Sequence, residues 1–309
     1  MEGHRVFRNS FDPNIMEILN YEEFLVELGR KLDEKYPNVK RVKIENVKLN
    51  EKKQGIVICY SNEIAATIYP ENLYGAYQGT ENMDVVLQII DWAVKNEQIP
   101  AYKQMLCTWE VVKSYVKPFV FNLEKNREYI EKTQCVYQER LDLAYACYIE
   151  IIDEETRDTA MMNVSEGMLE LWGISEQELF ETAEQNAVYE VKPMSVLIKE
   201  LTKQPMRNEL EHEADAMHVI SNEYRRRGAA GIFNTELIQK RTEELGCNFY
   251  ILPSSLHEII LMREDMASEM ETLREMVEEV NSTQVLVEDY LSDSIYYYDR
   301  ETKKVTIVE

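Results

Sequence analysis

"NFYILPSSLHEIILM" (residues 248–262) decides how the last third of the chain folds, because it places a short polar stretch between two apolar runs. Pro253 fixes its own φ angle and Ser254 can bond to nearby backbone, which is a combination typical of turns. Apolar runs of this length, bounded by a turn, are typical of buried strands. The stretch therefore predicts a strand, the turn "SSLH" and a second strand.

The sequence on either side of this hairpin is also regular. "AMHVISN" (216–222) predicts a strand, and residues 234–245 have helical spacing up to Gly246, a residue that suits the end of a helix. An acidic helix is expected over residues 266–279. "SIYYYDRETKKVTIVE" predicts a closing hairpin.

The first third begins with an amphipathic pattern at residues 21–36, which predicts a helix. The period then changes, and "VKRVKIENVKL", "QGIVICY" and "EIAATIY" predict a three-stranded meander. Helical spacing returns at residues 83–95 and through much of 101–117. Pro118 is expected to end that last helix, because proline removes a backbone donor and disfavours helix before it.

The middle of the chain predicts a central strand at residues 140–152, with "TAMMNVS" as its hairpin partner. "EGMLELWG" predicts a short helix that ends at Gly173. Ser175 and Glu178 have the spacing of a capping box at the start of a helix over 175–187. "SVLIKELTK" predicts one more short helix.

These elements indicate an α+β fold in which antiparallel strand meanders and hairpins pack with helices. We expect residues 1–20 to be a leader. An N-terminal α+β module then covers residues 21–135 and a C-terminal α+β module covers 136–309.

The charge of the chain limits its partners. Its 57 acidic residues against 34 Lys and Arg give a formal net charge of −23. Such a surface repels phosphate backbones and anionic lipid heads, so we expect no direct nucleic-acid partner and no membrane. The charge serves either solubility alone or mimicry of nucleic acid, in which the acidic surface occupies the basic groove of another protein.

The glycine and cysteine content indicates whether a cofactor is expected and in which compartment the protein is found. The chain has only 10 Gly and contains neither G-x-G-x-x-G nor G-x-x-x-x-G-K-[ST], so no cofactor is expected. Its five cysteines include no C-x-x-C pair, which is typical of reduced thiols in the cytosol. Without a signal-like N-terminus or a long apolar run, a soluble cytoplasmic protein is expected.

Ser254, Ser255, His257 and Glu258 in the hairpin turn are the candidates for catalysis. A nucleophile elbow would have glycines two residues before and after the serine, and neither is present. Serine and histidine of a triad also usually come from separate segments. The stretch is therefore either a structural turn or a turn that contacts a ligand, with hydrolase chemistry as a third possibility.

Two other clusters contain residues that bind ions. Glu211, His212 and Asp215 are candidate metal ligands, but they lack the H-E-x-x-H spacing, so no metal is expected and the carboxylates also suit a solvated helix face. "NEYRRRGAAG" (222–231) is the basic spot of this acidic chain, and its arginines can hold an anion or pair with acids. Its candidate ligand-binding residues are Asn222, Arg225, Arg227 and Gly228. We expect residues 222–228 to face residues 254–258 if a small-molecule site exists.

"EDMASEMETLREMVEEVN" (264–281) combines many acids with an apolar stripe rich in methionine. Such a stripe usually packs on the core. Methionine-rich faces also adapt to protein partners. Partner docking is therefore a second interpretation of this helix.

Several stretches together resemble one known family: "AATIYPENLYGAYQGT", "RLDLAYACYIEI", "MHVISNEYRRRGAAGIF", "NFYILPSSLHEIILM" and "VEDYLSDSIYYYD". They resemble the bacterial family catalogued as domain of unknown function 5688, over residues 20–309. The sequence departs from the family at Met262–Arg263, where a proline is expected soon after the apolar run. The resemblance implies a cytosolic bacterial protein and assigns no activity.

The function expected from these features is protein binding or regulation through a protein partner, and a basic partner is one case of this expectation. One special case is an acidic, nucleic-acid-mimicking inhibitor from a mobile element. The alternative is a small-molecule or phosphoester enzyme with a cleft between residues 222–228 and 254–258. For that enzyme, Asn222, Arg227, Ser254, His257 and Glu258 would have to share one cleft.

Overall fold

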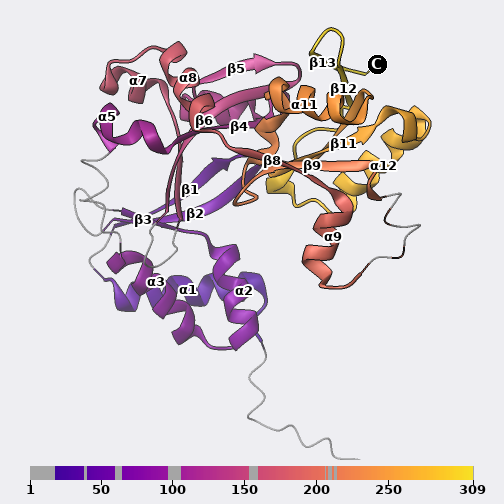
Figure 1. Cartoon of the computed structure of the whole chain (residues 1–309). Helices are drawn as coiled ribbons and strands as arrows, with labels where there is room; N and C mark the ends of the chain where they lie inside the picture. The colour runs from indigo at the N-terminus through magenta and orange to yellow at the C-terminus, as the bar shows by residue number, and fades with distance from the viewer. Residues whose placement is uncertain are drawn as a thin grey trace, which may run out of the picture. The chain divides into compact units, whose positions relative to one another are not determined.

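The computed structural model in Figure 1 describes residues 18–37, 40–59, 65–96, 106–152, 159–205, 207, 211 and 214–308. The chain divides into two compact units. Unit 1 comprises Met1–Asn46 and Lys53–Ile99, and unit 2 comprises Val47–Lys52 and Pro100–Glu309.

Unit 1 combines helices with a three-stranded sheet, as the pattern predicts. Its elements are α1 (Tyr21–Lys35), β1 (Lys40–Lys48), β2 (Glu51–Cys59), β3 (Ala65–Ile68), α2 (Pro70–Thr80) and α3 (Met83–Asn96). The end of β1 and the start of β2, within Val47–Lys52, belong to unit 2. The strands have the order β1-β2-β3, which confirms the meander. Helix α2 was not expected, and Pro70 opens it because a proline at the first helical position needs no N–H partner. Phe24, Leu28, Ile58 and Ile90 are among the buried residues of this unit.

The first sheet of unit 2 is built around one central strand. Its elements are α5 (Trp109–Val112), η1 (Lys113–Tyr115), β4 (Val116–Asn122), η2 (Glu124–Asn126), α6 (Arg127–Thr133), β5 (Tyr137–Arg140), β6 (Leu143–Ile152), β7 (Thr159–Asn163), α7 (Glu166–Trp172) and α8 (Glu176–Asn186). Strand β6 pairs antiparallel with β4, β5 and β7, so the predicted central strand and its hairpin partner are confirmed.

The prediction that Pro118 ends a helix is wrong. Pro118 lies inside β4, opposite Cys147 of β6. Within the described residues β4 pairs only with β6, and an outer strand tolerates the missing N–H of proline. The helix before it is reduced to α5 and η1, and residues 101–105 lie outside the described part. Residues 116–122, expected in the N-terminal module, thus belong to the sheet of unit 2.

The capping box predicted for α8 is half present. The Ser175 hydroxyl accepts the Glu178 N–H at 3.2 Å, which caps the helix. The Glu178 carboxylate accepts the indole N–H of Trp109 at 2.9 Å instead of returning to the Ser175 backbone. A tertiary contact has replaced the reciprocal bond of the box.

The second sheet of unit 2 contains the hairpin of residues 248–262. Its elements are β8 (Tyr189–Pro193), α9 (Met194–Thr202), β9 (Met217–Asn222), η3 (Gly228–Phe233), α11 (Thr235–Leu245), β10 (Phe249–Ser255), β11 (Glu258–Arg263), η4 (Glu264–Met266), α12 (Met270–Thr283), η5 (Val287–Asp289), β12 (Tyr296–Asp299) and β13 (Lys304–Ile307). The strand order is β13-β12-β10-β11-β9-β8. Strands β10 and β11 pair from Phe249↔Arg263 to Ser255↔Glu258, so the hairpin is confirmed.

One buried cluster joins both sheets of unit 2. It includes Phe119 and Tyr148 of the first sheet with Ile220, Ile259 and Tyr296 of the second. The Asp142 carboxylate accepts hydroxyls from Ser292, Ser294 and Tyr296 at 2.6–3.0 Å, which fastens the C-terminal strands to the first sheet. The α+β class is confirmed, because helices pack with antiparallel sheets in both units.

Two further expectations concern the compartment. Among the described residues, no helix is both long enough and apolar enough to cross a membrane. Cys107, Cys135, Cys147 and Cys247 are free thiols. Burial raises the pKa of Cys135 to about 12 and also raises that of Cys147, so both buried thiols stay protonated and are poor nucleophiles.

Candidate functional site

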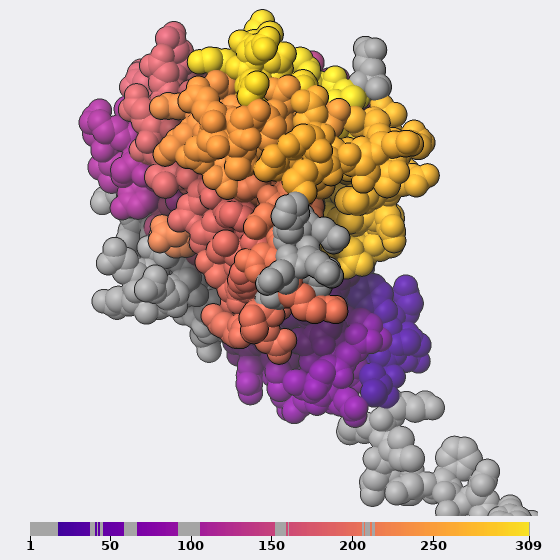
Figure 2. Space-filling view, turned by 45° about the vertical axis from the view of Figure 1, so that its right-hand side comes forward, coloured from indigo at the N-terminus to yellow at the C-terminus, as the bar shows by residue number. Residues whose placement is uncertain are grey.

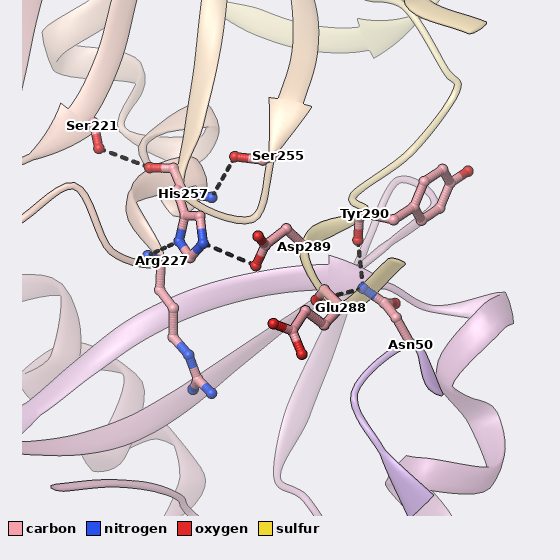
Figure 3. Close-up of polar contacts among 8 residues, drawn as sticks. All are labelled: Asn50, Ser221, Arg227, Ser255, His257, Glu288, Asp289 and Tyr290. Carbon is pink, nitrogen blue, oxygen red and sulfur yellow. Dashed lines mark hydrogen bonds and ion pairs between the residues drawn. The ribbon is translucent and has the colours of Figure 1, made fainter. Parts of the chain in front are cut away.

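The turn of the β10–β11 hairpin is held in place by two other segments of unit 2. The His257 carbonyl accepts the Gly228 N–H at 3.0 Å and the Ser221 hydroxyl at 2.7 Å. The Leu256 N–H donates to the Asp289 carbonyl at 2.8 Å. Figure 3 shows Ser221 and Asp289 on different sides of the histidine. These bonds satisfy turn groups that would otherwise need water, and they fix the position of His257.

Gly228 approaches this turn closely. A Cβ atom at this position would lie 2.6 Å from the Asn222 backbone nitrogen, 2.6 Å from Ser221 Oγ and 2.7 Å from the His257 carbonyl oxygen. Backbone atoms cannot move aside as the end of a flexible side chain can. A residue without a Cβ is therefore required here.

Both ring nitrogens of His257 are hydrogen-bonded. The Arg227 backbone N–H donates to Nδ1 at 3.2 Å, and Nε2 lies 2.9 Å from Asp289 Oδ1 (Figure 3). Because Nδ1 accepts, the neutral ring carries its proton on Nε2 and donates it to the Asp289 carboxylate. Asp289 was not among the predicted site residues, because it lies in η5, more than thirty positions further along the chain.

The two serines do not reach the imidazole as a nucleophile would. Ser255 Oγ accepts the backbone N–H of His257 at 3.1 Å, and Ser254 lies at the bulge between Pro253 and Ser255. A serine nucleophile needs a free imidazole nitrogen to take its proton, and neither nitrogen of His257 is free in this arrangement. Glu258 begins β11 and lines a small cavity of about 140 Å³ on another side of the turn.

The arginines of residues 225–227 diverge and do not form one anion cradle. Arg225 lies 3.5 Å from Glu200, and Arg226 donates to Thr159 Oγ1 at 2.8 Å. Arg227 donates to Asn163 Oδ1 at 2.7 Å, and its guanidinium lies over the rings of Phe119 and Tyr148. Burial lowers the pKa of Arg227. Each arginine fastens the loop to a different neighbour.

Asn222 closes the same loop. Its side chain accepts the Arg226 N–H at 3.0 Å and donates to the Arg226 carbonyl. Arg225 and Arg227 have positive φ angles of 51° and 55°, which such a tight loop imposes. The structure thus brings residues 222–228 and 254–258 together through backbone groups and the His257 ring, whereas the three arginine side chains bond to residues outside both segments.

The candidate metal ligands are only partly described. His212 lies outside the described residues. Glu211 is paired with Lys199, and Asp215 accepts the hydroxyl of Ser195. Across the described part of the chain, no group of three or more His, Cys, Asp or Glu side chains is placed to hold a metal ion.

Replacing His257 by alanine is expected to lower the free energy of unfolding by about 2 kcal/mol, because the Arg227 amide and the Asp289 carboxylate each lose a hydrogen-bond partner. Chemical denaturation of wild type and variant checks this. His257→Gln retains polarity at the position and should lose less. If alanine leaves stability unchanged, the imidazole contributes nothing to the turn and a role in ligand contact becomes the better interpretation.

Comparison with known proteins gives one match. The sequence profile of the family of unknown function DUF5688 matches residues 21–300, which confirms the resemblance seen in the sequence. The search of curated proteins gave no match, and neither did the search of solved structures.

Proposed function

The chain belongs to DUF5688, a family of unknown function, and we propose, from its charge and its surface, that it is a cytoplasmic protein that acts by binding a basic protein partner. The observation that carries the proposal is an exposed apolar face on α12 and the segment after it. Met276, Val280, Leu286 and Val287 are 36–65% exposed. We call these four residues the α12 face. The golden surface of the C-terminal third, which includes α12, is open to view in Figure 2.

Helix α12 has one apolar stripe that is only partly covered. Leu273 and Val277 are buried in a cluster with Leu252 and Met262 of the second sheet, so this part of the stripe packs on the core. Met276 and Val280 lie three residues from Leu273 or Val277, so they form the edge of the same stripe, where they are 40% and 36% exposed. Packing within the described part of unit 2 therefore leaves the α12 face at this edge uncovered.

The charge around the α12 face determines the partner chemistry. Glu275, Glu278 and Glu279 are exposed, and none forms an ion pair with another described residue. The cation of α12, Arg274, lies 3.7 Å from Glu271. An apolar stripe bordered by unpaired carboxylates complements an amphipathic segment that carries lysines or arginines. Methionine adapts to such a surface because its side chain is unbranched and flexible.

A more specific version of this proposal is that the acidic surface of the protein imitates nucleic acid when it binds the partner. The net charge of −23 supports it, since a protein that binds nucleic acid presents a basic surface of the complementary sign. The enzyme alternative has less support, because both nitrogens of the His257 ring are occupied and the arginines diverge. In the proposed complex, salt weakens binding by screening the carboxylates.

The test compares matched variants of equal charge. Glu275→Gln with Glu279→Gln neutralises the border of the α12 face, and Glu166→Gln with Glu170→Gln removes the same charge from α7. A partner recovered from host cells is purified, and its affinity for each protein is measured at low and moderate salt. We expect the α12 pair to weaken binding about tenfold or more and the α7 pair to leave it nearly unchanged.

A second variant tests the apolar part of the same face. Met276→Ser with Val280→Ser removes exposed methyl groups without a change of charge, and we expect it to weaken binding while the protein stays folded. The proposal is wrong if both glutamate pairs act equally, or if no purified protein binds the wild type with defined stoichiometry.

A further inference from the structure

A cavity of about 250 Å³ lies in unit 2 between the outer strand β4 of the first sheet and the ends of β8 and β9 in the second. It is not formed by the His257 turn or by the α12 face. Its lining is Lys117, Pro118, Tyr148, Asn186, Ala187, Val188, Tyr189, Asn222, Glu223 and Tyr224. Lys117, Tyr148 and Tyr189 can donate hydrogen bonds into the cavity. Pro118, Val188 and the ring of Tyr224 form its apolar part.

Tyr148 offers the cavity an unbonded hydroxyl. The residue is 1% exposed as a whole, and its hydroxyl makes no hydrogen bond with any residue that the structure describes. The hydroxyl is not one of the enclosed side-chain atoms that lack a partner in the described part of the chain, so it faces the cavity and is accessible to water there. The position is opposite Lys117 on β4, so both side chains rise from the same face of the sheet. A ligand in the cavity would supply the missing partner.

Tyr189 of the second sheet is half-buried and offers a second unbonded hydroxyl. Its hydroxyl also lacks a partner among the described residues, and its ring packs on Gly231, where an added Cβ would lie 3.2 Å from the ring. Burial raises the pKa of Tyr148 and of Tyr189, and for Tyr189 the nearby Tyr148 adds to the shift. Both phenols therefore remain protonated donors at neutral pH.

Lys117 supplies the cation of the cavity. Its ammonium group donates to the buried Glu150 at 2.7 Å and lies 5.4 Å from the ring centroid of Tyr224. An ammonium group has three protons, so this one keeps donors for a ligand. Glu150 offsets most of its charge, and Glu223 adds a second carboxylate at the cavity. A ligand with one negative charge is tolerated there better than a doubly charged phosphate.

We propose that this cavity binds the carboxylate of a small organic acid, with Lys117, Tyr148 and Tyr189 as donors. Pro118, Val188 and the ring of Tyr224 contact the apolar body of the acid. The site is independent of the partner surface on α12, because no residue is shared between them. Either proposal can fail without the other.

Tyr148→Phe is the decisive variant, because it removes the unpartnered hydroxyl and leaves the ring packing in place. Tyr145→Phe is the matched control. Tyr145 lies on the same strand, is 3% exposed and also has no partner for its hydroxyl in the described part of the chain, but it does not line this cavity. The probes are acetate, isovalerate, benzoate and phenylacetate, with their amides and inorganic phosphate as comparators. Binding is measured by ligand-observed NMR and titration calorimetry.

We expect at least one carboxylate to bind wild type and Tyr145→Phe equally, and to bind Tyr148→Phe about tenfold or more weakly. The Tyr148→Phe protein should unfold at nearly the same temperature as wild type, since the ring packing is kept and the hydroxyl bonds to no other described residue. This separates lost contact from lost folding. The proposal is overturned if none of the four acids binds, if phosphate or an amide binds better, or if Tyr148→Phe binds as tightly as wild type.

Discussion

Replacing Gly228 by alanine is expected to lower the free energy of unfolding by about 3 kcal/mol, which is the upper range for one added methyl group in a packed interior. The added Cβ would meet two backbone atoms and Ser221 Oγ at 2.6–2.7 Å. The His257 carbonyl would have to retreat, and with it the bonds it accepts from the Gly228 N–H and the Ser221 hydroxyl. Equilibrium denaturation by urea measures the loss.

Gly167 provides the matched control for this variant. It lies in α7 of the same unit, and an added Cβ there meets no atom within 4 Å. Gly167→Ala should be neutral or stabilising by up to about 1 kcal/mol, because alanine favours helix more than glycine does. If both alanine variants behave alike, the close approach of Gly228 to the turn is not what the protein depends on.

The hairpin could be predicted from sequence because its signals are local. Two apolar runs and a Pro-Ser turn lie within fifteen residues, and each element follows from its neighbours. Helix ends at Gly173 and Gly246 were predicted for the same reason, since both adopt the left-handed conformation that glycine permits. Pro118 was wrongly predicted to end a helix. A strand accepts proline when it is an outer strand of its sheet, and the order of strands in a sheet is not a local property of the sequence.

The candidate site shows the same limit. Residues 222–228 and 254–258 were expected to face one another, and contacts between Arg227, Gly228 and His257 join them. Asp289 could not be foreseen, because its pairing with His257 depends on how η5 crosses the turn. The hydrogen-bond partner of each polar side chain could not be predicted from the sequence either. The sequence shows that histidine, serine and arginine are present, but only the fold shows which neighbour each of them bonds to.

The burial of His218 has an expected consequence for stability as the pH falls. His218 lies on β9, is 2% exposed, and its Nδ1 has no hydrogen-bond partner among the described residues. Burial, with a smaller effect of Arg241, lowers the pKa of His218 from 6.5 to about 4. The folded protein therefore keeps this ring neutral at a pH where the unfolded chain already binds a proton.

Stability from this group should accordingly be complete above pH 6.5 and should fall as the pH drops from 6.5 to about 4. The total loss across this window is about 3 kcal/mol, since each pKa unit corresponds to roughly 1.4 kcal/mol. His218→Phe keeps an aromatic ring beside Phe249 and removes the titration. The free energy of unfolding of both proteins is measured by denaturation at closely spaced pH values, and carboxylates that titrate in both proteins cancel in the difference. Wild type should lose stability relative to His218→Phe throughout the window. Parallel curves would mean that the folded protein accommodates a protonated His218, and that the β9 face of the core is open to water.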